Sequence, residues 1–311
     1  MKILNILLSY PPYRYIGAEI YDHTLNKALH KKGHTVYVKT IDEINNNQPY
    51  QHENILINHP IPTDIDLIIT HIDLRQKAYH LKRLHNLNNT PMVGIQHNLG
   101  RETQTAERLY KWDGIIYNSQ HMANISRNPT APKTVLIPPT PNPSRKPISE
   151  GKAITQINLT ALKGAKDFWQ LVENNPHQQF IAVKGGWGAQ IIPTNIPDNV
   201  KIYEHQNNLT PIWKKTGALL FLSAPLEAWG MVASEANAHG IPVIHYTPRP
   251  GIEENVGTLG GYPISGSINT LNLTSIPTPS THIQQQAVEN YKKHKEQLKD
   301  TVEWVENIRK Y

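Results

Sequence analysis

The sequence predicts two consecutive α/β domains, each built on a parallel sheet with helices on both faces. Short apolar runs alternate with segments of helical spacing along most of the 311 residues, and this alternation is typical of parallel sheets. Residues 138–147 contain five prolines in ten positions and interrupt the alternation once. Such a run cannot lie inside a helix or a strand, so it marks the boundary between the domains.

The first domain is expected over 1–138. It starts with an apolar strand at 2–9, followed by a helix over 18–32 that repeats apolar residues on one face and stops at Gly33, a suitable C-cap residue. A basic amphipathic helix is expected over 75–87. Four further short strands are expected at 35–40, 66–70, 92–96 and 114–118.

A proline-rich linker over 139–151 precedes the second domain, which is expected over 152–282. Its helices are expected at 165–174 and 229–239. Its strands are expected at 153–158, 179–183, 200–203, 218–222 and 241–245. A last helix over 283–311, with apolar residues at helical spacing, is expected to cross back to the first domain, and a cleft is expected between the two domains.

Composition excludes several classes of protein. The chain has no cysteine, which excludes disulfides, thiolate metal sites and a cysteine nucleophile. No window approaches about 18 consecutive apolar residues, and the N-terminal apolar run is too short for a secretory signal, so we expect a soluble cytoplasmic protein. The net charge is +6. Residues 1–150 hold 17 basic and 12 acidic side chains (+5) and residues 151–311 hold 14 and 13 (+1), which favours an anionic partner for the first half.

The most informative stretch is 223–244, which reads as a strand, a loop containing Gly230, a helix and a second strand. Such a loop places backbone N–H groups and a helix N-terminus at the carboxyl edge of a parallel sheet, where anionic ligands bind. Glu227 and Glu235 stand eight residues apart in it. A carboxylate accepts two hydrogen bonds at once and suits sugar hydroxyls. The alternative is that both are surface glutamates on an ordinary helix.

This stretch resembles the Glu-x7-Glu signature of the retaining glycosyltransferases of family 4, which have the GT-B fold. Weaker similarities follow in the family's order along roughly 3–260: Gly17-Ala18, Lys32 to Val36, His97, Ile115 to Ser119, Val135 to Pro139, Leu162-Lys163-Gly164, and Pro250 to Glu254. The resemblance implies two Rossmann-like α/β domains facing a central cleft. It also implies transfer of a hexose or pentose from a nucleotide sugar, a UDP-sugar above others, with retention of anomeric configuration and without a metal or other cofactor.

The resemblance also implies roles for individual residues. Catalysis would involve His97, Glu227 and Lys163, with Lys163 neutralising the diphosphate. The donor-binding residues would be Gly17, Lys163, Lys184, Glu227, Ala228, Trp229, Gly230, Met231 and Glu235, the last of these holding the ribose. The chain departs from the family at Asn158, where an arginine usually accompanies the lysine. Lys184 and, second, Arg249 are the candidates to supply the missing charge. No Asp-x-Asp is expected on a loop after a strand, and the histidines do not show ligand spacing with carboxylates, so no metal site is predicted.

The acceptor is predicted from the basic first domain. The loop residues Tyr13, Arg14 and Tyr15 could stack on bases or sugars, and basic side chains add affinity for phosphates. The candidate acceptor-binding residues are Tyr13, Arg14, Tyr15, Arg75, Lys82, Arg83 and Arg101. We expect a hydroxymethylated pyrimidine in phage DNA, which would place the protein in the host cytoplasm. A lipid or cell-surface glycan acceptor is the alternative, and a non-catalytic nucleotide- or nucleic-acid-binding protein is the alternative of another class.

Overall fold

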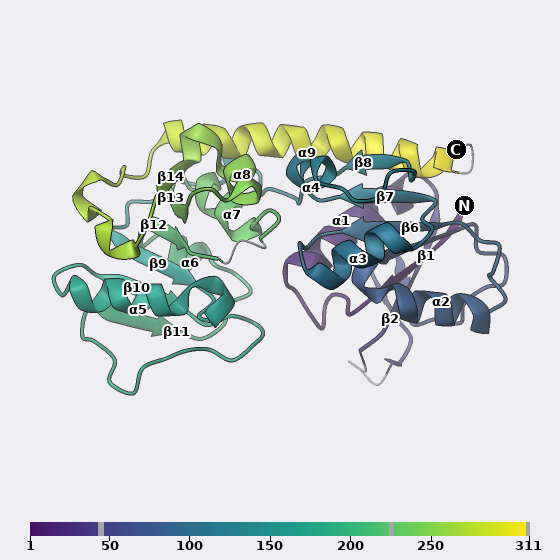
Figure 1. The fold of residues 1–311 in the computed structure, drawn as a ribbon, viewed down its shortest axis with the longest axis horizontal. Coiled ribbons are helices and arrows are strands. Elements are labelled where there is room, and N and C mark those ends of the chain that lie inside the picture. The colour runs from purple at the N-terminus through teal and green to yellow at the C-terminus, as the bar shows by residue number, and fades with distance from the viewer. Residues whose placement is uncertain (43–46, 224–226, 309–311) are drawn as a thin grey trace. The chain divides into compact units, whose positions relative to one another are not determined.

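The computed structural model describes residues 1–42, 47–223 and 227–308 (Figure 1). The chain divides into two compact units: unit 1 comprises Met1–Pro139 with His294–Tyr311, and unit 2 comprises Thr140–Lys293. Each unit holds one sheet flanked by helices. The α/β fold class predicted from the sequence is therefore confirmed.

Unit 1 contains an eight-stranded sheet in the order β3-β4-β2-β1-β5-β6-β7-β8. All neighbouring strands are parallel except β3 and β4, which form an antiparallel pair at one edge. The strands are β1 (Lys2–Leu7), β2 (Thr35–Thr40), β3 (Tyr50–His52), β4 (Ile55–Ile57), β5 (Leu67–His71), β6 (Met92–Gln96), β7 (Gly114–Tyr117) and β8 (Lys133–Val135). The central strands are buried on both faces, which explains their nearly continuous apolar sequence.

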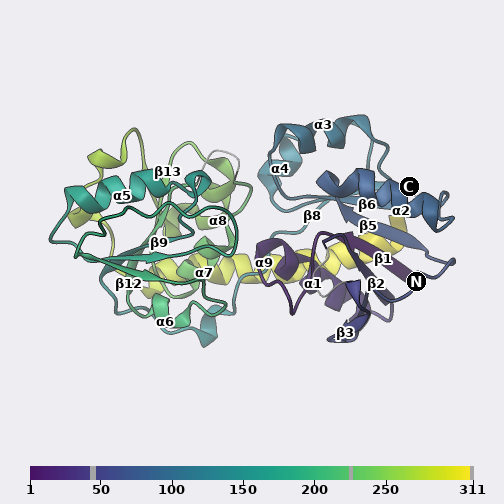
Figure 2. The same ribbon diagram turned by 90° about the horizontal axis from the view of Figure 1, so that it is seen from below.

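Helices cover both faces of this sheet. The helices are α1 (Gly17–Lys31), α2 (Arg75–Leu84), α3 (Arg101–Leu109) and α4 (Gln120–Asn124). Figure 2 shows α1 on one side of the sheet and α2 and α3 on the other. The chain leaves β1 toward β2 and later leaves β5 in the opposite direction, toward β6. Since parallel crossovers are right-handed, this reversal sends the helices to opposite faces and creates a topological switch point between β1 and β5.

Unit 2 contains a six-stranded parallel sheet in the order β11-β10-β9-β12-β13-β14. The strands are β9 (Ala153–Ile157), β10 (Phe180–Val183), β11 (Val200–Tyr203), β12 (Thr216–Phe221), β13 (Val243–Tyr246) and β14 (Gly261–Ile264). The helices are α5 (Ala165–Asn174), α6 (Thr210–Trp213), α7 (Met231–Ala238) and α8 (Pro250–Gly260). One core forms around Phe168 and Leu171 of α5, and a separate core forms around Trp213, Ala233 and Ile252 of α6, α7 and α8. The switch point of this sheet lies between β9 and β12.

The long helix α9 (Thr281–Asn307), yellow in Figure 1, contributes to both units. Its residues up to Lys293 belong to unit 2, and those from His294 onward belong to unit 1. Val302, Val305 and Ile308, in and just after its last turns, are part of the unit 1 core. Among the described residues, no helix combines the length and apolar character needed to cross a bilayer.

Candidate functional site

At the switch point of the unit 2 sheet, the turn that follows β9 requires a glycine. After β9, residues Ala161–Lys163 form a 3-10 turn, and Gly164 then adopts a left-handed conformation with φ of +80°. A Cβ at Gly164 would lie 2.4 Å from the Cβ of Leu222 and 2.6 Å from its carbonyl oxygen, so only glycine fits between the turn and the chain leaving β12. This close approach places Lys163 beside the end of β12.

The ion pair between Lys163 and Glu227 is the central feature of the site. The Lys163 ammonium donates to Oε2 of Glu227 and lies 5.9 Å from the centroid of the Phe221 ring. About a quarter of each charged side chain is exposed, 25% for Lys163 and 22% for Glu227. The pair is thus partly shielded, which strengthens its electrostatics, yet a ligand can still reach it. Residues 224–226, which precede Glu227 in the predicted motif, lie outside the described residues.

Gly230 lies immediately before α7 and positions the N-terminus of this helix near the Lys163–Glu227 pair. Its φ is +82°, and a Cβ there would lie 2.4 Å from Cζ of Phe221. Within the described part of the chain, no side chain caps the N-terminus of α7, so its first N–H groups remain available to an anionic ligand. The Asn255 amide fixes the loop by donating to the carbonyl oxygens of Trp229 and Gly230, each at 2.9 Å.

Glu235 lies on the second turn of α7, partly buried beside α6. Burial raises the pKa of the Glu235 carboxyl to about 7, although the Lys146 ammonium and the Trp213 side chain both act in the opposite direction. A carboxyl group with such a pKa changes charge close to neutral pH. Its predicted role, accepting hydrogen bonds from ribose hydroxyls, requires the ionised form.

Replacing Glu235 with glutamine should make the stability of the protein less dependent on pH. In the unfolded chain this carboxyl ionises near pH 4.3, and the fold favours its protonated form up to about pH 7. Its contribution to stability is therefore complete below the unfolded pKa and is lost as the pH rises through about 7. Thermal unfolding should show the Tm of the variant rising relative to the unmodified protein between pH 5 and pH 8. The exposed Glu303→Gln is the control, and a constant Tm difference across this range would contradict the pKa assignment.

Asn158 and the two candidate substitute cations each follow a different strand of the sheet. Asn158 follows β9 with φ of +68°, and its side chain accepts a hydrogen bond from the N–H of Thr160. Lys184 follows β10 and pairs with Glu204 at 2.7 Å. Arg249 follows β13, lies 5.9 Å from the Tyr246 ring centroid and donates to the carbonyl of Pro248. The Tyr246 hydroxyl in turn donates to Asp167 in the first turn of α5, which connects Arg249 to the helix that follows Lys163.

In unit 1, Gly17 opens α1, and His97 follows β6 at the carboxyl edge of the sheet. The ring of His97 lies 4.2 Å from that of His71, centroid to centroid. Burial and the neighbouring His71 hold the pKa of His97 well below its usual range. Burial alone would also lower the pKa of His71, but the Asp22 carboxylate outweighs it and raises that pKa.

The predicted acceptor residues come from several elements of unit 1. Arg14 pairs with Asp42 at 3.3 Å, and Tyr13 packs edge-on against Tyr50. Arg75 stacks on Tyr110, with 4.5 Å from its guanidinium carbon to the ring centroid. Among the other candidates, Tyr15 precedes α1, Arg101 begins α3, and Lys82 and Arg83 lie in the last turn of α2. Because α2 runs back from the carboxyl edge of the sheet, its last turn lies toward the opposite edge.

Several residues that shape these sites were not singled out from the sequence. Asn255 fixes the Trp229–Gly230 loop from α8, and Asp22, His71 and Asp73 gather around His97. Only His71 carried a usable signal, because it ends an apolar run as His97 does. The others depend on contacts between distant segments, which periodicity does not reveal.

Comparison with known proteins identifies the fold. No protein-family model and no curated protein matches the sequence. Among solved structures, a sucrose-phosphate synthase from Thermosynechococcus elongatus is 14% identical over 100% of both chains, with a TM-score of 0.75. A glycosyltransferase from Rickettsia africae is 13% identical over 99% of this chain and 98% of its own, with a TM-score of 0.68. HepE from Anabaena, solved with UDP-glucose, is 19% identical over 97% and 99%, with a TM-score of 0.74. The chain has the GT-B fold of two Rossmann-like α/β domains.

Proposed function

We propose that this protein is a glycosyltransferase that uses a nucleotide-sugar donor and retains the anomeric configuration of the transferred sugar. The observation that supports it most is the Lys163–Glu227 pair at the switch point of unit 2, beside the uncapped start of α7. Switch points of open α/β sheets are where such folds bind nucleotides. A cation and backbone N–H groups at this point are the groups that a diphosphate requires.

The transfer step can be explained from the Lys163–Glu227 ion pair. In the free protein Glu227 is the partner of Lys163. A bound diphosphate would take over the ammonium and leave the carboxylate to accept hydrogen bonds from the transferred sugar. As the bond between the sugar C1 and the phosphate oxygen breaks, negative charge grows on that oxygen, and Lys163 stabilises it where stabilisation increases the rate. The acceptor oxygen bonds to C1 on the face that the phosphate leaves, and its proton passes to the departing phosphate.

The donor and a second cation can be proposed from the same region. HepE was solved in complex with UDP-glucose, so UDP-glucose is the first donor to test. Arg249 is the better of the two substitutes for the family arginine, because the Lys184 ammonium is already paired with Glu204. The guanidinium of Arg249 donates to the carbonyl of Pro248 and lies over the Tyr246 ring, and its charge also helps to lower the pKa of Glu253. Glu235 would hold the ribose, and Ala228 and Met231 would line the diphosphate with their backbones.

For the acceptor we propose a hydroxymethylated pyrimidine in DNA, with a lipid or a glycan as the alternative. Exposed basic side chains on α2, on α3 and just after α3 support an anionic acceptor for unit 1; they are Lys77, Arg83, Arg101, Arg108 and Lys111. These side chains would add affinity for the DNA phosphates without recognising a particular base sequence. Arg14, another cation that the sequence assigned to this role, pairs with Asp42.

One experiment tests the donor and the acceptor together. The unmodified protein should show a higher Tm with UDP-glucose or another member of a nucleotide-sugar panel, because a ligand that binds only the folded state stabilises it. Labelled sugar should then pass to hydroxymethylated duplex DNA, with affinity falling steeply as salt increases. Glu227→Ala should abolish both slow donor hydrolysis and transfer.

The outcomes separate the alternatives. Transfer only to lipid or oligosaccharide would refute the DNA acceptor and leave the glycosyltransferase in place. A nucleotide that stabilises the protein without turnover would indicate a binding protein. If no nucleotide sugar raised the Tm, the proposed donor site itself would be wrong.

A further inference from the structure

The switch point of unit 1 gathers metal-ligating side chains. It lies between β1 and β5, the position at which open α/β sheets bind ligands. His71 ends β5, Asp73 follows it, and His97 follows β6, the next strand of the sheet. Each of these three residues offers one ligand atom, and the three atoms lie within 4.8 Å of one another.

The ring of His71 is held in the orientation that metal-bound histidines adopt. Its Nε2 lies 3.0 Å from Oδ1 of Asp22, and both side chains are buried. A carboxylate that accepts the N–H of one ring nitrogen fixes the ring and makes the other nitrogen a stronger ligand. Asp22 would keep this hydrogen bond while Nδ1 of His71 binds a metal.

His97 supplies a second, independent indication. Its Nδ1 is buried and has no hydrogen-bond partner among the described residues. A buried ring nitrogen without a partner is costly, and a native protein rarely leaves such a group unsatisfied. A metal ion bound by His71 and Asp73 would lie next to this nitrogen and would satisfy it.

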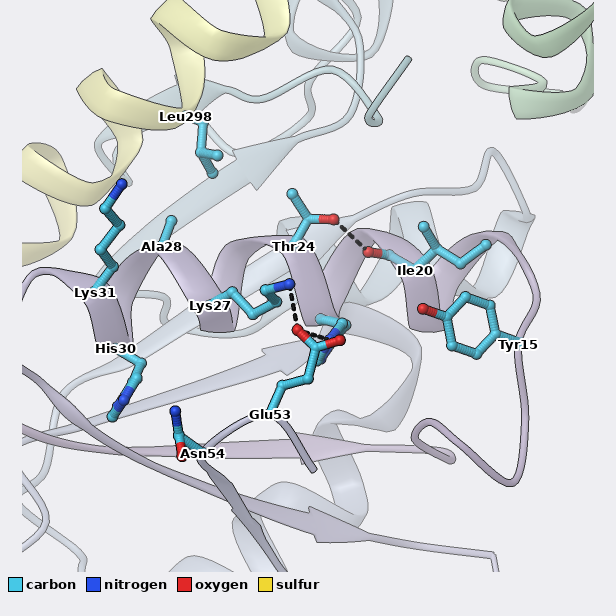
Figure 3. Close-up of a pocket in the computed structure, with 11 residues that line it drawn as sticks. Tyr15, Ile20, Thr24, Lys27, Ala28, His30, Lys31, Glu53, Asn54 and Leu298 are labelled. Carbon is cyan, nitrogen blue, oxygen red and sulfur yellow. Dashed lines mark hydrogen bonds and ion pairs between the residues drawn. The ribbon is translucent and has the colours of Figure 1, made fainter. Parts of the chain in front are cut away.

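A second cluster of His23, His52 and Glu53 meets the same distance criterion, but its chemistry is less suitable. Figure 3 shows Lys27 directed at Glu53, and this ammonium forms an ion pair with the Glu53 carboxylate. The pocket around it also contains His30 and Lys31, and its volume is about 730 Å³. An incoming cation would have to displace Lys27 and enter a basic environment. The charged partner of the first cluster is instead the carboxylate of Asp22.

We propose that His71, Asp73 and His97 bind one divalent transition-metal ion, of which Zn²⁺ is the simplest representative. Two imidazoles and a carboxylate suit zinc, iron, cobalt or nickel better than magnesium or calcium. Three protein ligands leave at least one coordination position open, as in catalytic rather than structural sites, and a water or a substrate hydroxyl can occupy it. This proposal differs from the sequence-based expectation of no metal. Its test does not require the proposed glycosyltransferase activity, but the site includes His97, to which the family resemblance assigns a catalytic role.

The test measures metal binding by the whole chain after treatment with a chelator. Calorimetric titration with Zn²⁺ should give one site per chain, and Co²⁺ should produce a visible absorption band at the same stoichiometry. Asp73→Asn, at an exposed position, should weaken binding at least about 10-fold, and Asp22→Asn should weaken it about 10–100-fold through the orientation of His71. Circular dichroism of each variant confirms that it is folded.

Two control variants make the result specific. His80→Gln removes an exposed histidine of α2, and His52→Gln disrupts the second cluster; both should bind Zn²⁺ as the unmodified protein does. No binding by the unmodified chain would overturn the proposal. Unchanged affinity in Asp73→Asn, or loss of the metal in His52→Gln, would overturn it as well.

Discussion

Replacing Lys163 with alanine is expected to lower kcat of sugar transfer by about 10²–10³-fold, the loss typical of removing one group that stabilises a developing oxyanion. Lys163 contacts Glu227 in the free protein and, in the proposed mechanism, the diphosphate during transfer. Because charge on the leaving oxygen grows toward the transition state, kcat should fall more than the affinity for the donor. Steady-state kinetics with a saturating donor measure this split.

The same substitution leaves Glu227 without its cation. The carboxylate is only partly exposed, so a modest loss of Tm is expected in addition to the loss of rate. Lys166→Ala, at an exposed position one turn further along the chain, removes an identical charge and should retain nearly full activity. A Lys163→Ala enzyme with unchanged kcat would show that the cation which stabilises the leaving group lies elsewhere.

Replacing Gly251 with alanine is expected to lower kcat/KM about 100-fold. A Cβ at Gly251 would lie 2.5 Å from the carbonyl oxygen of Glu227 and 2.6 Å from that of Ala228. Both contacts are with backbone, so the start of α8 and the backbone at Glu227 and Ala228 must move apart. A displacement of about 1 Å at a catalytic group costs on the order of 10²-fold in rate. Overpacking of this kind also destabilises a protein by about 1–3 kcal/mol.

Kinetics and thermal unfolding together distinguish the two effects of this variant. Thr258→Ala, at an exposed position in the same helix, tests whether any substitution in α8 disturbs the site, and we expect near-normal values for it. Should Gly251→Ala keep its kcat/KM while losing stability, the close packing of α8 would serve folding and not the position of Glu227.

The sequence predicted the helices and strands whose buried positions produce a clear periodicity of apolar residues or a continuous apolar run. The strands at 35–40, 92–96 and 200–203 and the helix at 165–174 agree with β2, β6, β11 and α5 to the residue. The hairpin of β3 and β4 was missed, because its strands have three residues each and too few buried positions to form a pattern. Helix α3 was missed because its sequence is almost entirely polar.

The buried polar contacts of α3 explain why its sequence is misleading. Glu107 lies inside the protein and accepts hydrogen bonds from Tyr117, Ser126 and the N–H of Arg127. From the hydrophobicity pattern alone, such a glutamate would be predicted to be exposed to solvent. The proximity of the residues in the proposed donor site was easier to predict: Lys163, Glu227 and Gly230 fall in one region because each follows a strand of a parallel sheet. The Asp22–His71–His97 group depends on a contact between α1 and β5, and spacing along the chain gives no sign of it.

Because helix α9 completes the core of unit 1, it affects how the protein folds during synthesis. Unit 2 is one continuous stretch, Thr140–Lys293, whereas unit 1 is made of the first 139 residues and the chain from His294 onward. Val302, Val305 and Ile308 pack with Ile3 and Leu7 in a single core, and the side chains of Trp304 and Ile308 fill the space against Gly114. During translation unit 1 therefore emerges first but cannot complete its core until the final turns of α9 leave the ribosome. The part of this core that α9 covers lacks its partner while all of unit 2 is made, a period in which it is exposed to aggregation and to chaperones.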